Sequence, residues 1–311
     1  MRTLLLTGGG GAGSEALYRL LGSRYKVHFA DADPESKPYS VPSNVWHHIP
    51  LAAAPDFVDA VGRLCRNLDV DLLVPGVDEE LLPISQARAA IAREVLLPPT
   101  EFVAAHLDKL ASYRFLNSLG VLVPEAEAIG ERRRVSFPCV VKPRRGRGSR
   151  DVAVVDSEDE LQAHVMRSRR PPDDFIVQER LRGQEYTVTM VADRTGRLRA
   201  VVPVKVGIKR GITLRAETDR DVAVTAACVA LHAAQPVAGC FNIQLVKAEG
   251  GEVKPFEINP RISTTMCLAV AAGVDFIDLY LEGGAAPTAG LSPFQDRLRL
   301  KRSWHNEFLL Q

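Results

Sequence analysis

The chain has 311 residues, 46% of them hydrophobic, and a formal net charge of +1; this length predicts about two or three domains with ample core. The balanced charge argues against a nucleic-acid or membrane partner, and no apolar run approaches the roughly 18 residues that a membrane span needs. The start MRTLLLTGGG indicates a buried strand rather than a signal peptide, and scattered cysteines without a CxxC pair indicate a cytoplasmic protein with reduced thiols: Cys65, Cys139, Cys228, Cys240 and Cys267.

Residues 1–98 alternate between strand and helix patterns. The strands are TLLLT, KVHFAD and DLLVPG, and the helices begin at Ser14, Pro55 and Glu79. This alternation predicts a Rossmann-like parallel α/β domain with helices on both faces of the sheet. The pair His47–His48 has no carboxylate pattern beside it and is expected at the surface or at a strand edge. The segment LLPPT, residues 96–100, marks the domain boundary.

The first turn of this domain is GGGGAG, Gly8 to Gly13, which satisfies GxGxxG and has Asp31 or Asp33 about twenty residues further on. Taken alone, this motif predicts an NAD(P)-dependent oxidoreductase, because the glycines let a phosphate approach the helix N-terminus. The alternative is a tight strand-to-helix turn. Nothing downstream resembles a dehydrogenase site.

The remainder of the chain mixes strands and helices in an α+β pattern. A helix at 108–119 ends at Gly120, and the strands CVVKP, VAVVD and FIVQE follow, with a helix capped by Ser157 and Glu160 between the last two. The strands EYTVTMVAD and LRAVVPVKV come next, then a helix at about 219–234 and a hairpin. The tail RLRLKRSWHNEF alternates like a final strand.

The basic segment VVKPRRGRGSRDVAVV, residues 140–155, places Lys142 at a strand end before a loop rich in glycine and arginine. Such a loop can cover phosphates with backbone N–H groups and positive charge. It is not a Walker loop, since no helix follows it. A solvated hairpin tip and a nucleic-acid contact are the alternatives, although no aromatic residues interleave with the arginines.

The hairpin is FNIQLVKAEGGEVKPFEIN, residues 241–259. A two-residue Gly250–Gly251 turn would make opposing residues sum to 501, so that Gln244 faces Glu257 and Asn242 faces Asn259. One side then carries these amides and the carboxylate, a donor set suited to Mg²⁺ with substrate phosphates. The other side is apolar: Phe241, Ile243, Leu245, Phe256 and Ile258. An ordinary solvated sheet face is the alternative.

Four segments in order, LDKLASYRFLNSLGV, VVKPRRGRGS, VQERLRGQEYTV and FNIQ…FEINPR, resemble the ATP-grasp superfamily, above all the carboxylate–amine ligases related to the carbamoyl phosphate synthetase large subunit. The resemblance spans residues 1 to about 284, and EINPR with the upstream Gln is its most specific part. It implies a pre-ATP-grasp domain at 1–98, an ATP-grasp small lobe with the phosphate loop at 99–182, and a C-terminal lobe with the metal-binding hairpin at 183–311.

The resemblance also implies roles for individual residues. Lys109 and Lys142 match positions that touch the ATP phosphates, and Lys209 matches one near the γ-phosphate. Arg261 matches an arginine that steadies the transferred phosphoryl group. The remaining matches are the phosphate loop (Gly146, Gly148, Ser149), the hinge beside adenine (Glu179, Leu181), the ribose carboxylate (Glu185) and the ligands of two Mg²⁺ or Mn²⁺ ions (Gln244, Glu257, Asn259).

Two positions depart from the family pattern. Arg150–Asp151 stands where relatives have another glycine in the phosphate loop, so this loop is expected to be stiffer or to touch the acceptor. After NPR, Thr264 replaces an arginine that would hold a small anion, which weakens a bicarbonate interpretation.

The implied reaction is phosphorylation of a carboxylate by ATP, followed by attack of an amine on the acyl phosphate. The acceptor substrate is expected at strand ends of the first domain, with the amine on Asp78 and Glu79 and an anionic group on Gly10, Gly11 and Gly13. Helix-start carboxylates favoured by the dipole are the alternative reading of the acidic pair. The expected partners are small molecules, and the family likeness favours a homodimer. The competing hypotheses are the oxidoreductase and a non-catalytic ATP-binding or nucleic-acid-binding protein.

Overall fold

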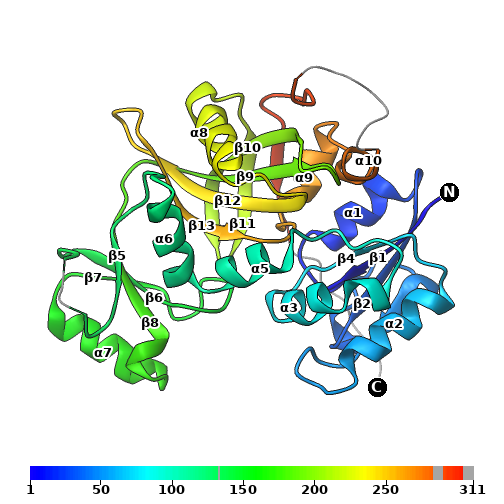
Figure 1. Ribbon diagram of the computed structural model, residues 1–311, viewed down its shortest axis with the longest axis horizontal. Helices are drawn as coiled ribbons and strands as arrows, with labels where there is room; N and C mark the ends of the chain where they lie inside the picture. Colours follow the sequence, from blue (N-terminus) through cyan, green and yellow to red (C-terminus); the bar gives the residue numbers. More distant parts are fainter. Residues whose placement is uncertain (132–133, 283–289, 304–311) are drawn as a thin grey trace.

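The structure is a computed structural model that describes residues 1–131, 134–282 and 290–303. Figure 1 shows an N-terminal unit in blue at one end, a green lobe at the other, and a large sheet between them. The N-terminal unit has a four-stranded parallel sheet, and the other two units have antiparallel sheets of four and six strands. The expected fold class, a parallel α/β domain followed by a two-lobed α+β fold, is confirmed.

The N-terminal sheet has the strand order β3-β2-β1-β4. Along β1, Leu4 and Leu6 pack into one core cluster and Leu5 packs into another, so helices cover both faces as expected. His47 and His48 lie in the edge strand β3. The elements are β1 (Thr3–Thr7), α1 (Ser14–Leu21), β2 (Lys26–Asp31), β3 (Trp46–His48), α2 (Phe57–Asn67), β4 (Leu72–Val74), α3 (Asp78–Gln86) and α4 (Arg88–Ile91).

The small lobe has the strand order β5-β8-β6-β7. The expected helix at 108–119 is α6, and a helix that sequence patterns did not reveal, α5, precedes it. Asp108 separates the two because its backbone is extended and its side chain accepts from the N–H groups of Leu110 and Ala111. The elements are α5 (Thr100–Leu107), α6 (Lys109–Ser118), β5 (Ala126–Ala128), β6 (Cys139–Pro143), β7 (Ala153–Val155), α7 (Glu158–Ser168) and β8 (Phe175–Glu179).

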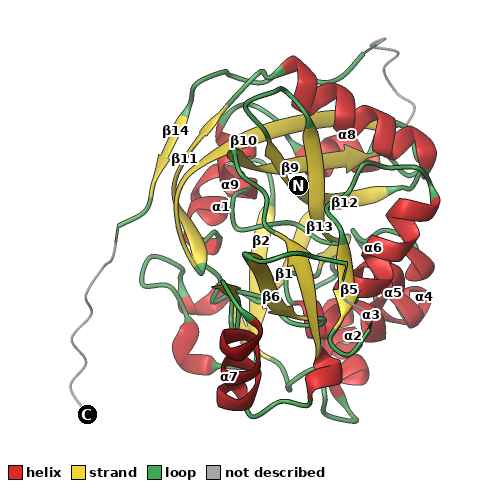
Figure 2. Ribbon diagram, turned by 90° about the vertical axis from the view of Figure 1, so that its left-hand side faces the viewer, coloured by secondary structure: helices red, strands yellow, loops and turns green. Residues whose placement is uncertain are grey.

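The large sheet has the strand order β13-β12-β9-β10-β11-β14. Helix α8 packs on one face with α5 and α6, while α9 and α10 pack on the other face with the N-terminal unit (Figure 2). Strand β11 was not expected, and the tail prediction is met only at β14, since its residues 304–308 lie outside the described part. The elements are β9 (Gln184–Ala192), β10 (Leu198–Arg210), β11 (Ile212–Thr218), α8 (Val222–Ala234), β12 (Gly239–Lys247), β13 (Val253–Asn259), α9 (Met266–Ala271), α10 (Phe276–Leu281) and β14 (Arg299–Lys301).

The β12–β13 hairpin has the predicted register where it matters. Asn242 opposes Asn259 and Gln244 opposes Glu257. Nearer the turn the register moves by one residue, so Leu245 opposes Pro255, and only Gly251 of the two turn glycines has a positive φ, +88°. The loop is therefore longer than the predicted two-residue turn, and a β-bulge restores the register.

The bulge also corrects one side-chain assignment. Phe241, Ile243, Leu245 and Ile258 are buried in the core as predicted. Phe256 is not part of this apolar face, because the extra residue at the bulge turns its ring toward a cavity on the polar side.

The five cysteines are free and buried, as expected of core thiols. In the described ranges, no helix combines the length and the apolar character needed to cross a bilayer.

Candidate active site

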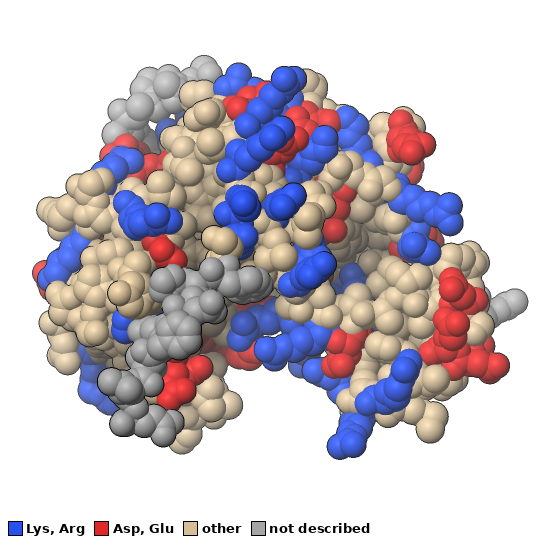
Figure 3. All heavy atoms as spheres, turned by 180° about the vertical axis from the view of Figure 1, so that it is seen from behind, with Lys and Arg blue, Asp and Glu red and all other residues tan. Residues whose placement is uncertain are grey.

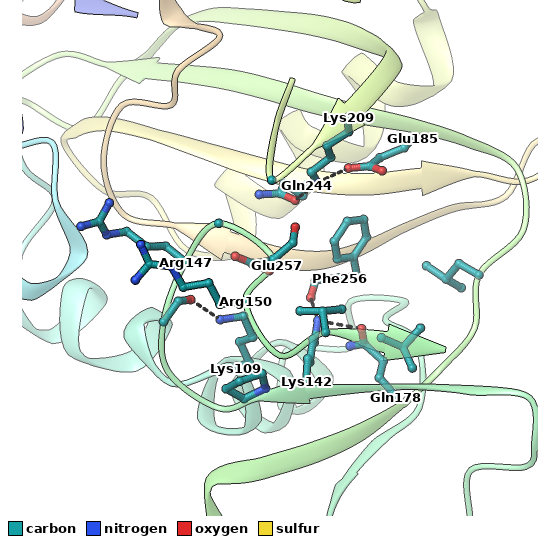
Figure 4. A pocket seen from close by; sticks show the side chains of 18 of the residues that line it. Lys109, Lys142, Arg147, Arg150, Gln178, Glu185, Lys209, Gln244, Phe256 and Glu257 are labelled. Atoms are coloured by element: carbon teal, nitrogen blue, oxygen red, sulfur yellow. Dashed lines mark hydrogen bonds and ion pairs between the residues drawn. The ribbon is translucent and has the colours of Figure 1, made fainter. Parts of the chain in front are cut away.

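A first cavity of about 530 Å³ lies between the small lobe and the large sheet (Figure 4). Its volume is in the range of small-molecule sites. The predicted nucleotide and metal residues that line it are Lys109, Lys142, Gly146, Gly148, Ser149, Glu179, Leu181, Glu185, Lys209, Gln244 and Glu257. Residues far apart in the sequence thus meet at one site, and the polar face of the hairpin points into it.

Lys142, at the end of β6, is the most deeply buried cation of the first cavity, with 4% of its surface exposed. Its ammonium group donates to Gln178 Oε1 at 2.9 Å and to the Phe256 carbonyl at 3.4 Å, and it lies 5.4 Å from the centre of the Phe256 ring. Burial lowers the pKa of Lys142 to about 8, while the Glu257 charge opposes this and the charges of Lys109 and Lys209 add to it. An anionic ligand would stabilise this buried charge.

The loop that follows β6 covers the cavity. Lys109, from α6, donates to the Gly146 carbonyl of this loop at 2.9 Å. Gly146 and Gly148 have φ angles of +116° and +72°, which disfavour any side chain although space is open around both. The loop therefore needs glycine for its backbone shape rather than for room.

Glu185, Lys209 and Gln244 form a connected row on the large sheet. Lys209 Nζ lies 2.5 Å from Glu185 Oε1 and 3.0 Å from Gln244 Oε1. Lys209 is thereby held between the β9 carboxylate and the hairpin amide. This arrangement fixes the ammonium group where the first cavity adjoins a second cavity, which is described below.

The link between the lobes contributes Glu179 and Leu181. The Glu179 carboxylate bonds to Lys254 at 3.3 Å and accepts from the Glu125 N–H at 3.2 Å. Leu181 adds to the apolar part of the wall, which also includes Val140, Val152, Val246 and Phe256. The cavity wall therefore has an apolar part as well as a charged one.

The hairpin residues present oxygen atoms suited to a hard cation. Asn259 Nδ2 donates to Asn242 Oδ1 at 3.4 Å, which leaves the side-chain oxygen of Asn259, Oδ1, available, and the Glu257 carboxylate faces the cavity. Gln244 Oε1 is engaged by Lys209. Within residues 1–131, 134–282 and 290–303, no group of three His, Cys, Asp or Glu side chains could hold a metal. A bound ion would therefore also need amide oxygens of the hairpin or oxygens of a bound small molecule.

A second cavity, of about 770 Å³, adjoins the first. Both are lined by Gln244, Glu257, Lys209 and Arg150, so the two cavities adjoin at these residues. The far wall of the second cavity is the N-terminal unit, at the carboxyl ends of its strands. Figure 3, which shows the molecule from behind, displays Lys and Arg side chains along the hollow between the two ends of the molecule.

Arg261 lines the second cavity, and its guanidinium Nε donates to the Asp78 carboxylate. Asn242 Nδ2 donates to the Arg261 carbonyl at 3.0 Å, so the hairpin also fixes the backbone at this position. Asp78 is not part of the cavity wall and is engaged by Arg261. Glu79 lines the wall but pairs with Arg147 of the phosphate loop at 3.2 Å.

The glycine turn is only partly available to a ligand. Gly10 and Gly11 line the second cavity, whereas Gly13 packs against the backbone of Thr264, 3.1 Å from where a Cβ would lie. The Gly10 N–H donates to Asp31 Oδ2 at 2.9 Å. Because Asp31 closes this turn, it is not free to bind a ribose. These contacts disfavour the dinucleotide hypothesis, as does the Thr264 backbone, which packs on Gly13 at the start of α1.

Glu80 lines the second cavity and was missed by sequence reasoning, which favoured its two neighbours. It is buried, with 5% of its surface exposed, and Thr7 Oγ1 donates to its carboxyl group. Burial is the main cause that raises the Glu80 pKa to about 7; the nearby Asp31 and Glu79 charges add to this, while the Thr7 bond and the Arg147 charge oppose it. No sequence signal distinguished Glu80 within the run DEE.

Known proteins that resemble this chain include ATP-grasp proteins and ligases. Residues 171–303 match the family model "ATP-grasp in the biosynthetic pathway with Ter operon". D-alanine–D-alanine ligase from Thermotoga petrophila is 39% identical over 93 residues, 29% of this chain and 30% of that enzyme. The same enzyme from Geobacter sulfurreducens is 27% identical over 265 residues, 77% and 81% of the two chains. Carbamoyl-phosphate synthase from Methanobrevibacter smithii is 24% identical over 124 residues, 35% of this chain and 33% of that protein.

Solved structures share the fold. An ADP complex of purK, N5-carboxyaminoimidazole ribonucleotide synthetase, has a TM-score of 0.71 and 14% identity, covering 96% of this chain and 79% of that one. L-amino acid ligase from Bacillus licheniformis has a TM-score of 0.67 and 16% identity, covering 90% and 73%. Pyruvate carboxylase from Rhizobium etli has a TM-score of 0.69 and 18% identity, and the match covers 92% of this chain but only 29% of the pyruvate carboxylase chain.

The architecture is an ATP-grasp fold preceded by a parallel α/β domain. The predicted resemblance to the ATP-grasp superfamily, and to proteins related to carbamoyl phosphate synthetase, is confirmed by the fold together with these matches.

Proposed function

We propose that the chain is an ATP-dependent ligase that phosphorylates a carboxylate to an acyl phosphate and couples it to an amine, releasing ADP and phosphate. The observation that carries this proposal is that two cavities adjoin at Gln244 and Glu257. One is cationic and bounded by the glycine-rich loop, and the other ends at strand termini of the N-terminal unit. A nucleotide and an acceptor could therefore occupy adjacent sites that meet at the hairpin.

The first cavity supplies groups suited to ATP. Lys109, Lys142 and the N–H groups of the Gly146–Ser149 loop would neutralise the phosphates. The apolar wall near Leu181 would hold the adenine, with backbone groups of the hinge beside its edge, and Glu185 would bind ribose hydroxyls. The neighbour solved with ADP and the ligases among the relatives support this use of the cavity.

The hairpin fits a divalent ion because Glu257, Gln244 and Asn259 present one carboxylate and two amides on the same face. Mg²⁺ prefers this kind of oxygen donor, completed by phosphates, and Mn²⁺ could replace it. When bound, two such ions would offset phosphate charge during phosphoryl transfer. For Gln244 to contribute its oxygen, Lys209 would have to turn from the amide toward the γ-phosphate.

The protein groups at the junction would stabilise charge rather than form covalent bonds. Arg261, oriented by Asp78, would hold the group in transfer from the second cavity, and Lys142 would hold it from the first. The carboxylate oxygen forms a bond to phosphorus as the bond to ADP breaks; the amine then forms a bond to the acyl carbon as phosphate leaves, and the amine loses a proton. The 144–152 loop would exclude water, which would otherwise hydrolyse the acyl phosphate.

The test is ADP release across a panel of amino acids and other small carboxylates, each with and without an amine, with hydroxylamine added to trap any acyl phosphate. We expect ADP and a hydroxamate with at least one carboxylate, and loss of both in Glu257→Gln. The matched control is Glu252→Gln, an exposed carboxylate near the turn of the same hairpin.

Binding of ATP without ADP release under any condition would contradict the ligase and favour a non-catalytic ATP-binding protein. Binding of NADH that is indifferent to Glu257→Gln would revive the oxidoreductase. The domain boundaries after residues 98 and 182, the cytoplasmic location and the homodimer stay predictions.

A further inference from the structure

Among the acidic residues that line the second cavity, Glu80 combines deep burial with a carboxyl oxygen that accepts no hydrogen bond in the described part of the chain. Asp31 accepts from the N–H groups of Gly10 and Asp33, at 2.9 and 3.0 Å. Asp33 accepts from the Glu35 N–H at 3.0 Å. These two carboxylates therefore hold their own loops in place.

The remaining carboxylates are engaged in other ways. Glu79 pairs with Arg147 across the cavity, and Glu257 belongs to the hairpin face that we propose for metal. The Glu80 side chain has a single hydrogen bond in the described part of the chain, from the Thr7 hydroxyl. Its second carboxyl oxygen has no partner there, although the side chain is about 95% buried and lines the cavity.

The Thr7 hydroxyl cannot satisfy both carboxyl oxygens of Glu80. It donates its one proton to Glu80 Oε2 and accepts from the Gly76 N–H at 3.3 Å. Thr7 on β1 and Gly76 after β4 thus fix the orientation of the Glu80 side chain, which extends from α3. The result is a preoriented carboxyl group whose second oxygen can accept a hydrogen bond from a donor in the cavity.

We propose that Glu80 binds an alkylammonium group of the small-molecule substrate, and that Glu80, rather than Asp78 or Glu79, is the amine-recognition residue of the second cavity. This inference rests on the proposed ligase function for the identity of the reaction, but its binding test does not depend on turnover. The chemical class is a primary amine, such as an amino acid, held as a cation by a charge-assisted hydrogen bond.

The electrostatics of the site agree with this assignment. The charged groups that act on Glu80 are Asp31 and Glu79, which disfavour its ionisation, and Arg147, which favours it. With a pKa of about 7 in the free protein, Glu80 is largely neutral below pH 7 and ionised above it. An ammonium group would stabilise the ionised form, so its affinity should rise with pH through this range.

The experiment is calorimetric titration of the whole protein, with Mg²⁺ and a non-hydrolysable ATP analogue present. The probes are the proteinogenic L-amino acids, D-alanine and 1,4-diaminobutane, each at about pH 6 and about pH 8.5, on either side of the Glu80 pKa. The proteins are the wild type, Glu80→Gln and the control Glu101→Gln, an exposed carboxylate on α5. Glutamine keeps the shape and the bond from Thr7, so a merely structural role would leave binding intact.

We expect at least one amine to bind the wild type and to bind about tenfold more weakly at pH 6 than at pH 8.5. Glu80→Gln should weaken binding at pH 8.5 about 10- to 100-fold and remove most of the pH dependence, while Glu101→Gln changes neither. Because Lys142 titrates equally in both proteins, the difference between them isolates Glu80.

Binding to Glu80→Gln within about twofold of the wild type would overturn the proposal, given that a single charge-assisted bond is worth more than this. Failure of every amine to bind the wild type would also overturn it. Glu80-dependent binding without any ADP release in the panel assay would instead contradict the ligase function and leave the amine site standing.

Discussion

The two cavities share one wall and differ in the other. Opposite the hairpin, the first cavity has a lysine buried in a sheet, a glycine-rich loop and an apolar hinge. The second has strand-end loops of the N-terminal unit, whose charged lining residues are acidic, while the basic lining residues come from later parts of the chain. The first is suited to a polyanion with a flat apolar end, whereas the second is suited to a small molecule that carries both charges.

The difference also concerns how the charged groups are satisfied. In the first cavity Lys142 is buried and donates to two neutral oxygens, and the nearby Glu257 charge favours its ammonium form without a salt bridge among the described residues. In the second cavity Arg261 and Arg147 already have carboxylate partners, Asp78 and Glu79. In the nucleotide cavity an anion would therefore stabilise the buried Lys142 charge. In the acceptor cavity Arg261 and Arg147 are already paired, and Glu80 is a buried carboxyl group without a salt bridge in the described part of the chain.

The largest expected effect comes from the shared wall. Glu257→Gln should lower ADP formation by about 10³-fold or more, because it removes the only carboxylate among the three proposed hairpin ligands. The free energy of unfolding should change by less than about 1 kcal/mol, since the side chain faces the cavity. The assays are ADP release and urea denaturation, with Glu252→Gln treated identically. If activity falls equally in both variants, the shared wall has no special role.

A second variant addresses the first cavity alone. Lys142→Met should weaken ATP binding about 100-fold or more and yet raise the free energy of unfolding at pH 7 by about 1–3 kcal/mol. The sign follows from the lowered Lys142 pKa: the unfolded chain binds the extra proton between about pH 8 and pH 10.5, so burial of the charge is unfavourable below pH 8 and is relieved as pH rises. Denaturant unfolding at pH 7 and pH 10 with ATP titration would measure both effects. Loss of stability at pH 7 would show that the buried ammonium group is well satisfied without ATP.

A smaller effect is expected at the far wall of the second cavity. The raised pKa of Glu80 means that the folded protein binds the extra proton between about pH 4.5 and pH 7, so this group stabilises the fold at low pH and the stabilisation is lost as pH rises through 7. Glu80→Gln should match the wild type near pH 4.5 and be more stable near pH 8 by about 1–3 kcal/mol. Thermal melts across this range provide the measurement. A stability difference that does not vary with pH would show that the Glu80 pKa is not raised.

The smallest effect is expected for the contact that crosses the second cavity. Arg147 and Glu79 are both roughly half exposed, and such pairs contribute between about 0 and 1 kcal/mol. A double-mutant cycle with Arg147→Gln and Glu79→Gln should give a coupling energy below about 1 kcal/mol that shrinks further in high salt. A coupling well above this value would mean that the phosphate loop is firmly anchored to the N-terminal unit in the absence of ligands.

The hairpin shows how far sequence patterns can specify a site. The pairing of Gln244 with Glu257 was predictable from period-two alternation, because a slip would expose Ile243 and Ile258. The turn and the bulge were not, since each shifts the register by one residue and the two shifts cancel at the functional end. Phe256 reaches the cavity through that bulge, and no composition rule marks the position.

The acceptor wall shows where such prediction stops. Asp78, Glu79 and Glu80 are adjacent and chemically similar, and their positions at a strand end suggested an amine site. Their different surroundings come from tertiary neighbours: Arg261 from the far end of the chain, Arg147 from the loop, and Thr7 from the first strand. A one-dimensional pattern does not contain these pairings, so it could indicate the region but not the residue.

The most direct test of the central claim, that the hairpin face binds nucleotide phosphates through a divalent ion, is a crystal structure with Mg²⁺ and a non-hydrolysable ATP analogue. The account predicts adenine against the apolar wall at Leu181, phosphates between Lys142 and Glu257, and metal density within bonding distance of Glu257 and Asn259. Nucleotide density on the Gly8–Gly13 turn, or phosphates remote from Glu257, would contradict it.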